Sequence, residues 1–166
     1  MREHFFAPWS TNLKLTTGGL AIVLIIAAIA TAGWGSLVIL AILLVAVAFS
    51  IRGYSVMDGK LLIHHLGWAN KFDLADLVSA EVNPGATMGS LRTMGIGGLF
   101  GSIGHFHNEI LGSYKAYATN EFNTVVLVFG NETIVVTPDD PEEFVESVTA
   151  ASRALSPAAE TDGVEE

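Results

Sequence analysis

Residues 15–51 read LTTGGLAIVLIIAAIATAGWGSLVILAILLVAVAFSI, a run of 37 residues without one charged side chain. Lys14 and Arg52 bracket this run. As one helix it would be about 55 Å long, whereas the apolar core of a bilayer is about 30 Å thick. Two helices therefore fit better than one, with a turn at Gly33-Trp34-Gly35-Ser36. We expect residues 15–52 to form a two-helix transmembrane hairpin embedded in the lipid bilayer.

Two other interpretations of this apolar run stay open. A cleaved signal peptide would use Ala30-Thr31-Ala32 as its cleavage site, but a second apolar segment follows at once. Two buried helices of a soluble α-domain would each show a polar stripe with a period of 3.6 residues. Residues 37–48 show no such stripe, which favours the membrane hairpin.

Basic residues predict the orientation of the hairpin. Arg2 and Lys14 precede it, Arg52 and Lys60 follow it, and the turn between the helices has no Lys or Arg. Because basic residues favour the cytoplasmic side, we expect both termini in the cytoplasm and two spans across the cell (inner or plasma) membrane. We expect residues 1–14 to form a short amphipathic segment at the membrane interface, with Phe5, Phe6 and Trp9 at the level of the headgroups.

Composition excludes several classes of protein. Of 166 residues, 51% are hydrophobic and only 15% are charged, which excludes disorder over most of the length. The net charge of −9 is concentrated at residues 138–166, which carry nine acids and one base. The chain lacks the clustered basic excess of a nucleic-acid-binding protein. It has no cysteine, which excludes disulfides, thiolate metal sites and a Cys nucleophile.

The remainder of the chain predicts a small β domain over residues 53–156. Asp58-Gly59 between two apolar runs predicts a tight hairpin. A terminal helix follows, with Asp140 as N-cap and Pro141 in its first turn. We expect residues 157–166 to be a disordered acidic tail. The strands are expected at residues 54–57, 60–66, 70–74, 77–82, 113–119, 122–129 and 133–137.

Residues 89–112 are rich in glycine and apolar side chains, and we expect a long connection here rather than strands. Either this connection packs inside the domain, or it contacts the membrane or a partner. Its glycines do not match a phosphate-binding loop, because the flanking strand, helix and Gly-Lys-Ser/Thr ending are missing.

The segment at residues 94–144 resembles the core of bacterial membrane-anchored proteins with a pleckstrin-homology-like domain. The matching pieces are GIGGLFG at 95–101, YKAYATN at 114–120 and TPDDPEEF at 137–144. The resemblance implies a mainly β, PH-like barrel of about seven antiparallel strands capped by the C-terminal helix. It implies no reaction and no cofactor. Phosphoinositide binding is not expected, since the first hairpin carries only Lys60 beside Asp58.

Candidate binding residues lie in the Gly-rich stretch, and we expect neither a catalytic set nor a metal site there. The candidates are Arg92, Ile96, Leu99, Phe100, His105 and His107. We predict a non-enzymatic interaction module that binds a protein or peptide, or a second copy of itself, at the cytoplasmic face of the membrane. The alternative is a small-ligand-binding or enzymatic membrane protein that uses the Gly-rich loop with His105, His107 and Arg92.

Overall fold

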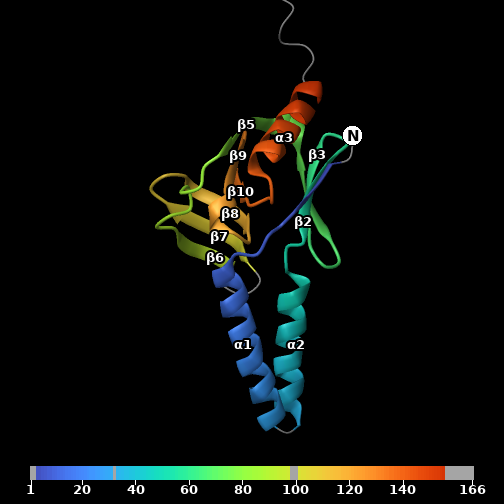
Figure 1. Ribbon diagram of the computed structural model, residues 1–166, viewed down its shortest axis with the longest axis vertical. Helices are drawn as coiled ribbons and strands as arrows, with labels where there is room; N and C mark the ends of the chain where they lie inside the picture. The colour runs from blue at the N-terminus through green and yellow to red at the C-terminus, as the bar shows by residue number, and fades with distance from the viewer. Residues whose placement is uncertain (1–2, 32, 98–100, 156–166) are drawn as a thin grey trace, which may run out of the picture.

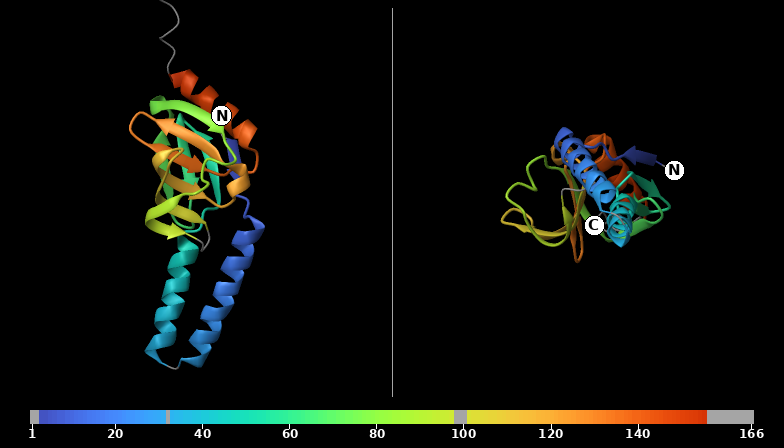
Figure 2. Two further views of the ribbon diagram at one scale, coloured as in Figure 1. Left: turned by 90° about the vertical axis from the view of Figure 1, so that its left-hand side faces the viewer. Right: turned by 90° about the horizontal axis from the view of Figure 1, so that it is seen from below.

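The computed structural model describes residues 3–31, 33–97 and 101–155, which form a pair of helices and a sheet-rich domain (Figure 1). Helices α1 (Thr11–Ala30) and α2 (Trp34–Ala48) lie side by side and project from one end of the domain (Figures 1 and 2). The prediction of two apolar helices is confirmed. Helix α1 begins earlier than expected because Ser10 caps it: its Oγ accepts a hydrogen bond from Leu13 N at 3.2 Å.

The domain contains two sheets and ends in helix α3 (Pro141–Leu155), in agreement with a PH-like fold. One sheet has the order β1-β2-β3-β4 and the other β5-β9-β10-β8-β7-β6. Short 3-10 helices, η1 (Leu74–Asp76) and η2 (Glu121–Asn123), connect β4 to β5 and β8 to β9. The strands are β1 (Glu3–Phe6), β2 (Gly53–Met57), β3 (Lys60–His64), β4 (Ala69–Asp73), β5 (Leu77–Val82), β6 (Leu91–Gly97), β7 (Ser102–Asn108), β8 (Gly112–Ala118), β9 (Val125–Phe129) and β10 (Thr133–Val136).

The expected strand count and pairing need correction. The described residues form ten strands rather than about seven, and β8 pairs with β10 in parallel. The extra strands come from the N-terminal segment and the Gly-rich stretch, in which no clear period-2 pattern signals a strand. The predicted turn at Asp58-Gly59 is confirmed, since both residues have positive φ (53° and 72°), as a type I′ turn requires.

A hydrophobic core fills the space between the two sheets, and α3 covers its end (Figure 1). Tyr54 of β2 is fully buried there and joins the sheets. Its hydroxyl donates to the backbone oxygen of Tyr117 at 2.7 Å and accepts from Thr137 N at 3.2 Å. Burial raises the pKa of Tyr54 to about 12. The predicted cap of α3 is also confirmed, because Glu143 N donates to the Asp140 carboxylate at 3.0 Å.

The N-terminal segment packs on the domain, which differs from the interfacial anchor that we expected. Glu3–Phe6 forms β1, which pairs with β2 along the edge of the first sheet. Phe5 is 5% exposed and packs edge-on against Phe144 of α3, with ring centroids 5.2 Å apart. The alternation of side chains along a strand sends Phe5 inward and leaves Phe6 63% exposed. A four-residue strand is too short for its pattern to be recognised in the sequence.

The Gly-rich stretch is not the long connection that we expected. It contains β6 and β7, which pair as an antiparallel hairpin, and β7 continues the sheet onto β8. Two positions of the stretch, Leu99 and Phe100, lie outside the described residues, as does the predicted tail at 157–166.

Candidate interaction surface

Strand β6 is the outermost strand of the six-stranded sheet. Among the described residues, no strand pairs with its outer edge. Leu91 and Met94 of β6 are 74% and 70% exposed, and a register shift between Arg92 and Met94 marks a bulge. An exposed strand edge with apolar side chains is a template for pairing with another chain. The hairpin is therefore the first candidate for an interaction surface.

The structure places Arg92, His105 and His107 on this hairpin but not on one face of it. Residues paired across antiparallel strands share a face. Arg92 pairs with Phe106, whereas Leu91 pairs with His107 and Met94 with His105. The two histidines therefore share one face, as the alternation predicts, and Arg92 lies on the other. The predicted combination of Arg92 with the two histidines does not form.

The other candidate binding residues that the structure describes show no arrangement that indicates a particular ligand. Ile96 belongs to β6 and pairs with Ile103. His105 and His107 are exposed, and His107 Nδ1 lies 3.2 Å from the hydroxyl of Ser113. Within residues 3–31, 33–97 and 101–155, no three His, Asp or Glu side chains are grouped closely enough to hold a metal ion.

A pair of glycines determines how closely β6 and β7 approach each other. Gly95 and Gly104 face each other across the hairpin, with φ of +119° and +137°. A Cβ atom on Gly104 would lie 2.2 Å from the oxygen of Met94, and one on Gly95 would lie 2.3 Å from the oxygen of Ile103. Only glycine allows this backbone conformation and this contact. Gly95 and Gly104, which in the sequence are typical of a loop, are therefore needed for β6 and β7 to pair.

A cavity of about 380 Å³ lies between β4, at the edge of the first sheet, and strands β7 and β8. His105 lines it together with aromatic side chains, and His65 forms part of its wall. The His65 ring stacks on Trp68, with centroids 5.0 Å apart, and its Nδ1 donates to the backbone oxygen of Phe49 at 2.9 Å. Its buried Nε2 has no hydrogen-bond partner among the described residues. Burial lowers the pKa of His65 and so favours the neutral ring.

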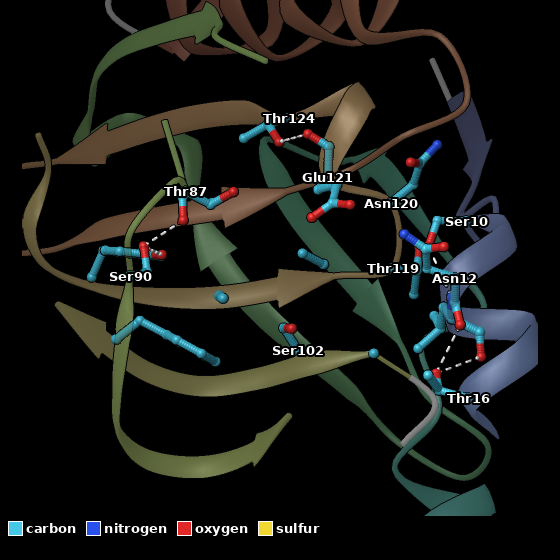
Figure 3. A pocket seen from close by; sticks show the side chains of 16 residues that line it. Ser10, Asn12, Thr16, Thr87, Ser90, Ser102, Thr119, Asn120, Glu121 and Thr124 are labelled. Carbon is cyan, nitrogen blue, oxygen red and sulfur yellow. Dashed lines mark hydrogen bonds between the residues drawn. The ribbon is translucent and has the colours of Figure 1, made fainter. Parts of the chain in front are cut away.

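A second pocket, of about 330 Å³, lies on the opposite face of the six-stranded sheet, next to the start of α1 (Figure 3). Phe106 and Tyr114 of β7 and β8 form part of its wall. Hydroxyl and carboxamide side chains surround it, and Glu121 is the single charged residue among the described residues that line it. No local sequence pattern indicates this pocket, because its residues come from four separate segments of the chain.

The charge of the hairpin region is close to balanced. Lys115 of β8, beside His105 in the register, forms an ion pair with Glu132. Both side chains are partly exposed, so this pair contributes little to stability. The surface therefore lacks the convergent positive charge that recognises phosphate groups.

Comparison with known families agrees with this architecture. The model of the Bacterial PH domain family matches residues 52–152, which are more than half of the chain and include both sheets except β1, together with most of α3. No curated protein and no solved structure matches the chain. The sequence resemblance noted above is thereby confirmed at the level of the family, and the chain belongs to the Bacterial PH domain family.

Proposed function

We propose that this protein is a membrane-anchored, non-enzymatic interaction module that binds an extended segment of a neighbouring protein, or of a second copy, along β6. PH-like domains generally act in binding rather than in catalysis. The observation that carries the proposal is the open edge of β6 with its exposed apolar side chains. Addition of a strand to such an edge is an established mode of peptide recognition.

The outer surface of the helix pair supports the membrane anchor. Apolar side chains point outward around both helices, and Ile26, Ile29 and Leu44 are each more than 60% exposed. Helix α1 has 20 residues and is long and apolar enough to cross a bilayer. Helix α2 has 15 residues, about 22 Å, so it would need local thinning of the bilayer or a short extension. Without lipid or protein around it, this surface would face water.

The pairing of β1 with β2 supports an even number of membrane crossings. Strand β1 precedes the helix pair and β2 follows it, yet they pair over four positions. The segment between β1 and β2 therefore begins and finishes at the same end of the helix pair, the end next to the domain (Figure 1). If the helices cross a bilayer, they cross it twice. The distribution of basic residues favours the cytoplasm for this common side.

The same pairing argues against the signal-peptide interpretation. Cleavage after Ala32 would remove β1 together with α1. The core would then lose Phe5, whose ring packs on Phe144 and is 5% exposed. A segment that completes the core of the folded domain is expected to stay attached to it.

Site-directed photo-crosslinking in intact membranes tests the proposed contact strand. A photoreactive amino acid replaces Met94 of β6 in one variant and Val78 of β5 in the control. The two side chains are both 70% exposed and lie on opposite edges of the same sheet. We expect adducts from position 94 and none from position 78. The mass of the adduct separates a second copy from another protein. Equal adducts at both positions, or none at position 94, would reject β6 as the contact strand.

Alkaline carbonate extraction tests the anchor separately. We expect the chain to stay with the membrane pellet, since apolar side chains surround both helices. Release into the supernatant would reject the anchor, whatever the crosslinking shows.

A further inference from the structure

From the pocket beside α1, we infer a binding site for a neutral polyhydroxylated group, which means a sugar ring. This pocket lies between the first turns of α1, the segment at residues 87–90, strands β7 and β8, and η2 (Figure 3). Its volume of about 330 Å³ is at the lower end of small-molecule sites. Some polar groups of the lining bond within the protein, and others have hydrogen-bonding capacity to spare.

Several lining side chains are already used within the protein. Ser90 accepts a hydrogen bond from the Tyr114 hydroxyl at 2.7 Å, Thr119 donates to the oxygen of Pro8, and Thr124 donates to the oxygen of Glu121. These bonds hold the walls of the pocket together. The first bond joins β8 to the loop before β6, and the second joins the residue after β8 to the segment that leads into α1.

Other side chains of the lining retain unused donors or acceptors, among them Asn12, Ser102, Asn120 and Glu121. The Asn120 Oδ1 accepts from Phe122 N at 3.2 Å, which leaves both hydrogens of its carboxamide without a partner among the described residues. No side-chain hydrogen bond within the described residues uses the hydroxyl of Ser102 or the carboxylate of Glu121. These groups offer donors and acceptors in nearly equal measure, and hydroxyl groups of a ligand can use both.

Phe106 is the aromatic part of the wall that suits the remaining surface of a sugar, because Tyr114 behind it is only 3% exposed. The rings of Phe106 and Tyr114 stack at 5.9 Å with an interplanar angle of 23°. The C–H faces of a pyranose are apolar and pack on aromatic rings, while its hydroxyl groups point sideways to polar partners. An apolar ligand would leave the polar rim unpaired.

The charge of the pocket lining favours a sugar over a phosphate group and over an ammonium group. No Lys, Arg or His belongs to the described lining, so a phosphate group would find no cation there. An ammonium group would be attracted by Glu121, but it would leave the donors of Asn120 and Ser102 unused. A neutral polyhydroxylated group satisfies both kinds of partner.

The sugar can come from two sources. Asn12 belongs to the first turn of α1 (Figure 3). The proposed anchor places this turn at the membrane surface. A glycolipid headgroup therefore reaches the pocket from the bilayer, and a free oligosaccharide reaches it from solution. The glycolipid source rests on the proposed function, whereas the free sugar does not.

Titration by two-dimensional NMR of the full chain in phosphatidylcholine nanodiscs tests the inference. The probes are maltose, nanodiscs that contain monoglucosyl-diacylglycerol, and ethanolamine as the ammonium control. We expect shifts of the Ser102 and Thr119 amide signals with maltose, with the glycolipid, or with both, and none with ethanolamine. Shifts with the glycolipid nanodiscs but not with maltose would identify a site for a lipid headgroup. Co-elution of chain and nanodisc reports on the anchor independently.

Variants then identify the groups that bind. Asn120→Asp keeps the oxygen that accepts from Phe122 N and removes the free donor, so we expect sugar affinity to fall roughly 3- to 10-fold. Ser102→Ala should have a similar effect. Asn131→Asp makes the same change of charge outside the pocket, and Ser79→Ala the same loss of hydroxyl; neither should alter binding. Native-like spectra show that each variant folds.

Two results would overturn the inference. One is the absence of shifts with both maltose and the glycolipid. The other is binding of ethanolamine that tightens in Asn120→Asp and is lost in Glu121→Gln, since that response is characteristic of an ammonium site.

Discussion

Replacement of Gly104 by alanine should open the β6–β7 hairpin without a change in any exposed side chain. The added Cβ would lie 2.2 Å from the oxygen of Met94 and 2.7 Å from the Cα of Gly95. To restore ordinary contact, the two strands would have to separate by about 1 Å. Gly104 also has φ of +137°, a conformation that residues with a side chain rarely adopt.

The size of the effect follows from these two terms. The unfavourable backbone conformation costs about 1–3 kcal/mol. The separated strands lose part of their ladder, at about 1 kcal/mol for each hydrogen bond. Together these terms predict a loss of about 2–4 kcal/mol of local stability, which corresponds to roughly 30- to 1000-fold faster amide exchange. Gly95→Ala should behave alike, because its Cβ would lie 2.3 Å from the oxygen of Ile103.

Hydrogen–deuterium exchange measured by NMR or mass spectrometry separates this local effect from general destabilisation. We expect faster exchange in β6 and β7, while the amides of β2 and β3 keep most of their protection. Gly67→Ala and Gly130→Ala are matched controls, because a Cβ at either position meets nothing within 4 Å and neither residue has positive φ. Unchanged exchange in β6 and β7 of Gly104→Ala would refute the reasoning about the glycine pair.

Three further predictions concern the core. Phe5→Ala should destabilise the domain by about 3 kcal/mol in a urea titration, whereas Phe6→Ala should have little effect, because these side chains are 5% and 63% exposed. Equal losses of stability in the two variants would contradict the assignment of β1. Tyr54→Phe should cost about 1–3 kcal/mol by the same assay, since it leaves the buried N–H of Thr137 without its partner; an unchanged midpoint would show that another group accepts this bond. The pKa of His65 is lowered in the folded state, so the unfolded state binds the proton more readily. The contribution of His65 to the free energy of unfolding should be fully present above about pH 6.5 and should decline as the pH drops towards the folded pKa. Melting temperatures from pH 7.5 to 5 should show this loss in the parent and less of it in His65→Gln.

The parts of the fold that the sequence predicts well have local causes. The Asp58-Gly59 turn needs two residues with positive φ in succession, and few residue pairs other than Asp-Gly or Asn-Gly provide this. The cap of α3 depends on Asp140 and on backbone groups within one turn of it. The helix pair follows from the length and hydropathy of one segment. In each case the residues that determine the structure are neighbours in the chain.

The parts that the sequence does not predict depend on contacts between distant segments. Strand β1 is stable because Phe5 meets Phe144, which is 139 positions away, and because β2 offers an edge. The glycines of the β6–β7 hairpin resemble loop glycines until Gly95 and Gly104 are known to face each other. The burial of His65 likewise requires Phe49 and Trp68 to pack around it. A local pattern cannot show such contacts, so the sequence alone predicts a loop for residues that form the β6–β7 hairpin.

The short connections between the helix pair and the domain limit the directions from which a partner can reach the domain. Helix α2 leads into β2 through four residues. Hydrogen bonds also hold the segment before α1: Ala7 N donates to the oxygen of Arg52 at 3.4 Å, and Ser10 N donates to the oxygen of Thr119 at 3.1 Å. Two short connections leave the domain little freedom to rotate about the helices. With the helices in a bilayer as proposed, β6 and the pocket beside α1 would keep a fixed height and direction. Binding would then select partners that present a strand or a sugar at that height, and confinement to two dimensions would raise their effective concentration.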